Sequence, residues 1–71
     1  MEIVEAELSA VVWKIAVAVG DHVEEGDELM ILESMKMEIP VEATAAGRVV
    51  SIDVAEGDGV SEGTPLVTLG D

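Results

Sequence analysis

The 71-residue chain lacks cysteine, phenylalanine and tyrosine, and it has a single tryptophan. Without cysteine, neither disulfides nor thiolate metal ligands can stabilise the fold. Valine and isoleucine together fill 17 positions, and such β-branched side chains favour strands over helices. A chain this short can bury only one small core. We therefore expect one strand-rich domain that spans residues 1–71.

Positive charge is scarce as well. Only Lys14, Lys36 and Arg48 oppose 16 aspartates and glutamates, which gives a formal net charge of −13. This balance excludes nucleic acids and anionic membranes as partners. It is typical of a highly soluble surface, and we expect a monomer in isolation. The alternative interpretation of the acidity is a basic docking surface on a partner protein.

Long apolar segments are absent. The apolar stretch at residues 10–19 contains Lys14 and has about half the length that a membrane-spanning helix needs. The first residues, Met1 to Glu5, lack the basic start and the apolar stretch of a secretory signal, so we expect a cytoplasmic protein. No stretch of ten or more residues has a sustained helical period, and helices are not expected.

Residues suited to catalysis or metal binding are also few. The one histidine, His22, lies next to Asp21, where we expect it to be a solvated surface residue. No pair of a nucleophile and a base is apparent, so the chain is not expected to be an enzyme. The acidic residues of segment 21–28 lack the spacing of a calcium loop, and no metal site is predicted.

What the sequence does contain is an internal repeat. A shift of 37 residues aligns its two halves without a gap and gives 14 identities. We place repeat A at about residues 2–34 and repeat B at about residues 39–71, since such self-similarity indicates two similar structural units. The residues that recur 37 positions later are Val4, Glu5, Ala6, Val12, Ile15, Val17, Ala18, Gly20, Asp21, Val23, Glu25, Gly26, Leu29 and Leu32.

Within each repeat the pattern is that of short strands. Trp13, Ile15 and Val17 alternate with other residues, which predicts a strand with one core face and places Trp13 in the core or at its rim. Val12 breaks the alternation, which indicates either a bulge or a strand covered on both faces. The apolar run 29–32 and its repeat predict strands that are buried on both faces.

Turn signals separate these strands. Gly20-Asp21 and Gly26-Asp27 recur as Gly57-Asp58 and Gly63-Thr64, and glycine can supply the positive φ of a tight turn. Two similar halves that cannot bury their apolar faces alone would pack on each other. We therefore predict an all-β fold, a flattened β-barrel or sandwich of two antiparallel sheets with internal pseudo-two-fold symmetry.

The repeat also singles out one lysine. Between the two copies lies a connecting hairpin at residues 35–37, with Lys36 at its centre. The symmetry that exchanges the copies relates this junction to the place where the chain termini lie. We therefore expect Lys36 on an exposed turn at the opposite end of the domain from Met1 and Asp71.

The segment Glu33-Ser34-Met35-Lys36-Met37-Glu38 resembles the attachment motif of biotinyl and lipoyl carrier domains. The resemblance covers essentially the whole chain and is closest to the short free-standing biotin/lipoyl attachment proteins, which are biotin carboxyl carrier-like. It implies that a biotin protein ligase attaches biotin covalently to Lys36, and that Glu33, Met35 and Met37 help the ligase to recognise the turn. It further implies a carrier that shuttles carboxybiotin between biotin carboxylase and carboxyltransferase subunits.

Two other functions remain as alternatives. A lipoyl carrier would bear lipoate on the same lysine and serve an oxo-acid dehydrogenase or a glycine cleavage system, but lipoyl domains typically show Asp-Lys-Ala where this chain has Met-Lys-Met. The second alternative is an interaction module that stays unmodified. The methionines also have another interpretation, since Met35 and Met37 could simply cover the end of the barrel.

Overall fold

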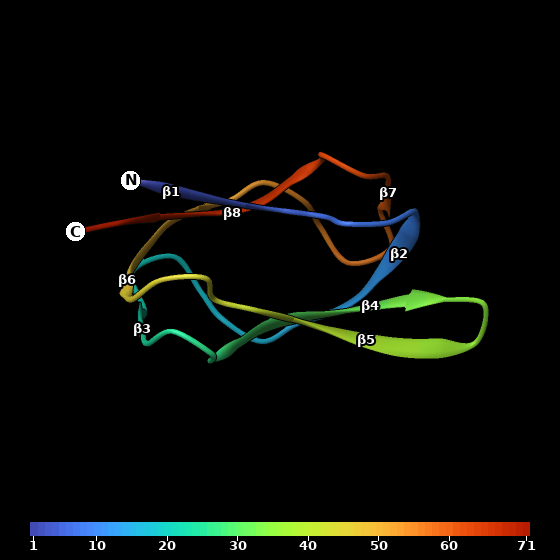
Figure 1. Cartoon of the computed structure of the whole chain (residues 1–71), viewed down its shortest axis with the longest axis horizontal. Coiled ribbons are helices and arrows are strands. Elements are labelled where there is room, and N and C mark those ends of the chain that lie inside the picture. Colours follow the sequence, from blue (N-terminus) through green and yellow to red (C-terminus); the bar gives the residue numbers. More distant parts are fainter.

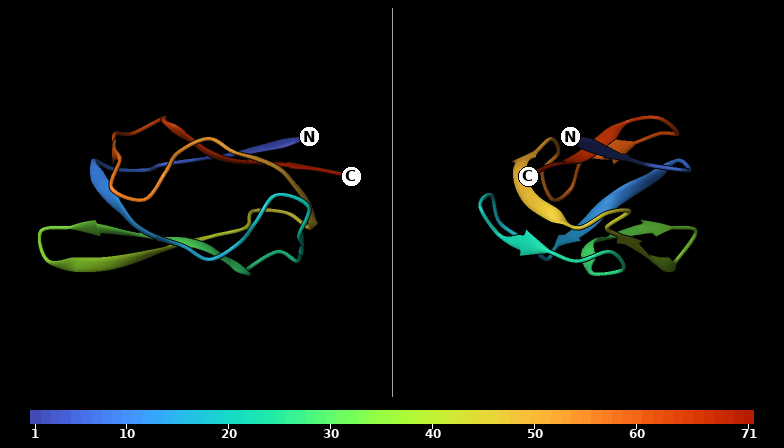
Figure 2. Two further views of the ribbon diagram at one scale, coloured as in Figure 1. Left: turned by 180° about the vertical axis from the view of Figure 1, so that it is seen from behind. Right: turned by 60° about the vertical axis from the view of Figure 1, so that its left-hand side comes forward.

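The computed structural model describes all of residues 1–71 and contains eight β-strands and no helix (Figure 1). The strands form two four-stranded antiparallel sheets that face each other (Figure 2). This confirms the all-β prediction, with a flattened sandwich in place of a closed barrel. The strands are β1 (Glu2–Glu5), β2 (Ala10–Ile15), β3 (His22–Val23), β4 (Glu28–Ser34), β5 (Met37–Glu42), β6 (Gly47–Ile52), β7 (Gly59–Val60) and β8 (Pro65–Gly70).

Each sheet draws strands from both halves of the chain. The strand orders are β1-β8-β6-β3 in one sheet and β5-β4-β2-β7 in the other. Exchanging β1 to β4 with β5 to β8 converts one order into the other. Four of the six neighbour pairs join strands from different halves: β1 with β8, β3 with β6, β4 with β5 and β2 with β7. Only β2 with β4 and β6 with β8 lie within one half. Neither half could therefore form this sandwich alone.

The core is made of thirteen buried apolar side chains, and no polar or charged side chain is buried. All of them except Val4 form pairs that lie 37 positions apart in the sequence; the counterpart of Val4, Val41, is half-buried. Burial of aliphatic area is the main force that holds the two sheets together. The paired residues are Ala6 and Ala43, Val12 and Val49, Val23 and Val60, Leu29 and Leu66, Met30 and Val67, and Leu32 and Leu69.

Bulges resolve the breaks in the alternating pattern. In the pairing of β2 with β4, Val12 lies opposite Leu32 and Lys14 opposite Ile31, so that Trp13 is the extra residue. The equivalent irregularity in β6 leaves Val50 unpaired. Of the two interpretations of Val12, the bulge is therefore correct.

The bulge also corrects the prediction for Trp13. The extra residue shifts by one position the alternation of side chains between the two faces of the strand. Val12 therefore lies in the core, and Trp13 points outward and is 47% exposed. Its ring lies 5.8 Å from the Lys14 Nζ atom, within the range of a cation–π contact.

The strands at 29–32 and 66–69 are likewise not covered on both faces. Register shifts next to Leu29 and Leu66 let two consecutive residues face the core, while Ile31 and Thr68 remain partly exposed. A bulge places one extra residue on one strand, which explains the continuous apolar runs without a second covering layer.

The turns follow the glycine signals. Gly20, with φ 98°, and Gly57, with φ 95°, adopt the left-handed conformation that was predicted for them. One residue later, Asp21 and Asp58 each accept a 2.9 Å hydrogen bond from the backbone N–H three residues before them. These carboxylates thus stabilise turns, which accounts for part of the acidity.

The molecule measures 34 × 17 × 17 Å, and its long axis separates the hairpin from the termini. Figure 1 shows the β4–β5 hairpin at one end and both chain termini at the other. The predicted placement of Lys36 opposite Met1 and Asp71 is confirmed. No helix of a length and apolarity sufficient to span a membrane is found.

Candidate functional site

The candidate site is a two-residue turn between β4 and β5. Ser34 and Met37 are the last paired residues of the two strands, so that Met35 and Lys36 alone make the turn. Their φ angles are 52° and 65°, and they are the only residues other than glycine with positive φ. Positive φ at both central positions of a two-residue hairpin is characteristic of a type I′ turn, whose twist matches that of the flanking strands. Met37 therefore belongs to β5, and the turn is one residue shorter than the predicted 35–37.

This conformation has an energetic cost. Asparagine and glycine are the usual residues of a type I′ turn, and an ordinary side chain in the left-handed region costs roughly 1–2 kcal/mol. Met35 and Lys36 both accept this cost at the tip of the hairpin. Backbone strain of this kind concentrates at functional positions.

The Lys36 side chain is free. It is exposed to solvent, and the only ion pair in the molecule joins His22 Nε2 to Glu24 Oε2 at 2.6 Å. The carboxylates of Glu33 and Glu38 therefore lie near Lys36 in the hairpin without pairing with its amine. An amine in this position can enter another protein's active site without first breaking a contact in its own domain.

The two methionines are exposed, and they do not cover the core. Met35 is 92% and Met37 is 65% exposed, and neither belongs to the core cluster. The interpretation that they close the end of the barrel is therefore wrong. Together with Lys36 they form a small polarisable surface at the tip of the hairpin.

Two carboxylates lie one residue pair inside the turn. Glu33 of β4 is directly opposite Glu38 of β5, and both are exposed. Like charges in directly opposed positions of a sheet destabilise the pairing. On the other side of β4, Glu33 is opposite Val11, and neither Glu33 nor Glu38 makes an ion pair.

The other cations and the histidine lie elsewhere. Lys14 is within β2 and contacts Trp13, whereas Arg48 lies in β6 opposite His22 and Gly70. His22 is exposed, as predicted. No group of three or more histidine, aspartate or glutamate side chains is arranged to hold a metal ion.

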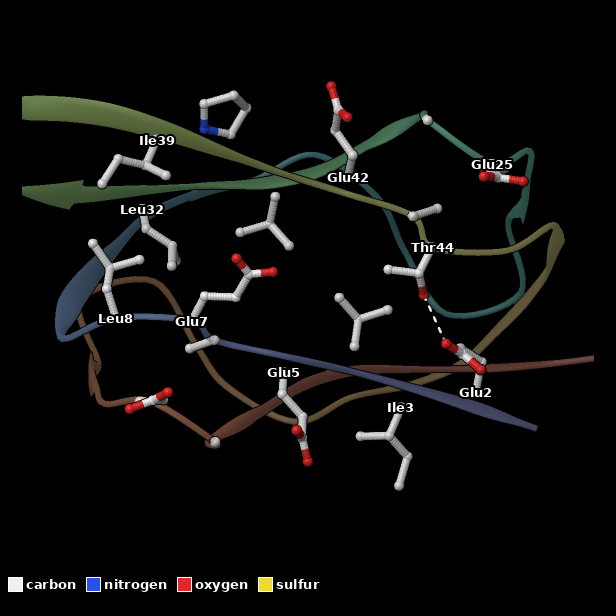
Figure 3. Close-up of a pocket in the computed structure, with 18 residues that line it drawn as sticks. Glu2, Ile3, Glu5, Glu7, Leu8, Glu25, Leu32, Ile39, Glu42 and Thr44 are labelled. Carbon is white, nitrogen blue, oxygen red and sulfur yellow. Dashed lines mark hydrogen bonds between the residues drawn. The ribbon is translucent and has the colours of Figure 1, made fainter.

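One feature escaped the sequence-based prediction. A groove of about 1090 Å³ lies between β1 and β5 (Figure 3). Its walls repeat with the same offset of 37 residues, from Val4, Glu5 and Ala6 on one side to their counterparts 41–43 on the other. The recurrence of Val-Glu-Ala in the two halves was the available signal, because it marks two edge strands with the same pattern.

Comparison with known proteins extends these observations. The family model described as "Biotin-requiring enzyme" matches residues 2–69. The biotin/lipoyl attachment protein of Bacillus subtilis is 44% identical over 68 residues, which cover 96% of this chain and 93% of that protein. The biotin carboxyl carrier protein of Streptococcus mutans is 44% identical over 64 residues, covering 90% of this chain and 49% of that protein.

A solved structure shows the same fold. The urea carboxylase of Kluyveromyces lactis matches with a TM-score of 0.91 and 40% identity, covering 97% of this chain. The match spans only 6% of that much longer enzyme. With a family match over nearly its full length, this chain belongs to the biotin/lipoyl family, whose model carries the description of a biotin-requiring enzyme.

Proposed function

We propose that this chain is a carrier of covalently bound biotin, which a biotin protein ligase attaches to Lys36. The observation that carries the proposal is the turn: Lys36 is exposed, unpaired and held in a left-handed conformation at the far end of the molecule. The names of the Bacillus and Streptococcus relatives support the same role. The chain would be one carrier domain, with repeats at about 2–34 and 39–71 on either side of the turn.

The domain holds the Lys36 amine in a fixed, exposed position, and the ligase must provide the base and the activated biotin. A lysine amine must lose its proton before it can attack an activated acyl group, and no carboxylate or histidine of the domain contacts the Lys36 amine to accept it. The rigid hairpin fixes where the amine is, which lowers the entropy cost of bringing it into an active site. Lys14 is a poorer substrate because it lies within β2 and contacts Trp13.

The ligase would recognise the surface around the turn. Met35 and Met37 offer exposed, adaptable apolar area on both sides of Lys36. Glu33 adds a carboxylate whose charge is reinforced by Glu38 opposite it. A cation on the ligase would relieve the repulsion between these two carboxylates, so the pair favours a basic partner surface.

Bound biotin would accept a carboxyl group at one active site and release it at another. The chain itself would bring the tethered biotin to each active site and bind the partner enzymes, and we propose no catalytic role for its residues. Tethering to Lys36 raises the effective concentration of the cofactor at a biotin carboxylase and at a carboxyltransferase. The match to a urea carboxylase supports partners of this type.

The choice between biotin and lipoate has a direct test. The purified chain is incubated with ATP and either biotin plus a biotin protein ligase or lipoate plus a lipoate ligase, and intact masses are recorded. The proposal predicts complete conversion with biotin and little with lipoate. Preferential lipoylation would make the chain a lipoyl carrier, and absence of both modifications would favour an unmodified interaction module.

A further inference from the structure

The groove between β1 and β5 lies where the two sheets leave their edges open. β1 is the last strand of one sheet and β5 is the last strand of the other, so each has a hydrogen-bonded neighbour on one side only. An edge strand presents backbone N–H and C=O groups that another chain can pair with. Figure 3 shows these two strands on opposite sides of the groove.

The two edges differ in their capacity to accept an added strand. Pro40 lies in the middle of β5 and has no backbone N–H to donate. β1 and the segment that follows it to Leu8 contain no proline. An incoming strand would therefore pair with β1, which is four residues or roughly 13 Å long.

The side chains along β1 determine what such a strand would carry. Val4 and Ala6 are buried, whereas Glu5 and Glu7 are exposed and line the groove. Opposed residues of neighbouring strands share a face of the sheet. An added strand would thus place apolar residues beside Val4 and residues of the opposite face beside Glu5, while Glu7, beyond the end of β1, points toward β5 (Figure 3).

The negative charge of the groove favours basic side chains at the remaining positions of the incoming strand. Six glutamates and no lysine or arginine line it, and none of the six makes an ion pair. Figure 3 shows the Glu7 carboxylate between the two strands, and at one end the Thr44 hydroxyl donates a 2.9 Å hydrogen bond to Glu2. At the other end Leu8, Leu32 and Ile39 provide an apolar mouth. The six glutamates are Glu2, Glu5, Glu7, Glu25, Glu42 and Glu62.

We propose that this groove binds an extended segment of a partner protein with alternating basic and apolar side chains, which adds to β1 as a further strand. Backbone pairing along β1 gives the segment its register. Its basic side chains neutralise carboxylates that have no partner in the free domain. The site is separate from the turn that holds Lys36, and the inference does not depend on biotin attachment.

The test uses a short blocked peptide of alternating arginine and valine, titrated into the ¹⁵N-labelled chain and followed by NMR. The proposal predicts shifts concentrated at residues 2–8 and 39–44. The triple variant Glu5→Gln/Glu7→Gln/Glu42→Gln should bind the peptide about tenfold more weakly. The control Asp53→Asn/Glu56→Gln/Asp71→Asn makes the same change in charge at residues that line neither the groove nor the turn, and it should change affinity less than twofold.

Three results would overturn the proposal. Shifts spread over the whole acidic surface, or equal weakening by both triple variants, would indicate unspecific attraction to the net charge. Equal binding of a peptide with glutamine in place of arginine would remove the role of charge. Shifts at the groove that depend on protein concentration alone would make its occupant a second copy of the chain.

Discussion

Glu33 and Glu38 lie directly opposite each other where β4 pairs with β5, one residue pair from the turn that holds Lys36. Two carboxylates in this arrangement repel each other. A sequence selected only for stability would have an opposite charge at one of the positions. Their placement beside the exposed lysine is instead consistent with recognition by a basic surface.

This relationship predicts opposite effects on stability and on modification. Glu33→Lys should stabilise the domain by about 0.2–1 kcal/mol, because it replaces repulsion from Glu38 by attraction. The same change should slow biotinylation at least several-fold. Thermal unfolding and a time course of intact mass measure the two effects, and unchanged or faster biotinylation would exclude Glu33 from ligase recognition.

The left-handed turn gives a second prediction. Met35→Asn should stabilise the domain by about 1 kcal/mol, because asparagine tolerates positive φ better than methionine. Met37→Asn is the matched control, since Met37 is an exposed methionine in extended β5 that gains nothing from this tolerance. Urea unfolding compares the two variants. Equal stability changes would show that strain at Met35 is negligible.

A close backbone contact at the far end of the molecule gives a third prediction. A Cβ atom at Gly47 would clash with the Gly70 carbonyl oxygen, whereas one at Gly59 would meet nothing within 4 Å. Gly47→Ala should therefore destabilise the domain by about 1–3 kcal/mol through overpacking. Gly59→Ala, also at the start of a strand, should be nearly neutral in the same urea unfolding experiment. Similar losses in both variants would contradict the packing argument.

The charge distribution predicts an effect of salt. With a net charge of −13 and no lysine or arginine in an ion pair, the surface is dominated by repulsion between carboxylates. Sodium chloride screens this repulsion, so raising its concentration should increase stability by an amount of the order of 1 kcal/mol. Urea midpoints at low and high salt provide the measurement. A decrease with salt would mean that attractive charge contacts dominate.

The sequence predicts the architecture because the repeat imposes it. Identities such as Val12 with Val49 and Gly20 with Gly57 establish two equivalent halves, and these became the two interleaved sheets. The exposed position of Lys36 followed from the same symmetry. Single-residue orientation was harder to predict: Trp13 was placed at the core, but a bulge reverses the side on which it lies.

The groove could not be predicted for a different reason. Its walls come from strands in different sheets, and the recurrence of Val-Glu-Ala around Glu5 and Glu42 marks two similar strands without indicating that they border one cavity. The left-handed conformation of Met35 and Lys36 was equally hidden, because neither residue type favours it. Local propensity is overridden here by the register of β4 and β5.

The central claim is that Lys36 alone carries the cofactor, and mass spectrometry of the ligase-treated chain tests it most directly. Wild-type protein and Lys14→Arg should each gain the mass of one biotin, located by peptide mapping at Lys36, while Lys36→Arg should gain none and unfold at nearly the same temperature as wild type. Biotin on Lys36→Arg, or its location at Lys14 in the wild type, would contradict the account.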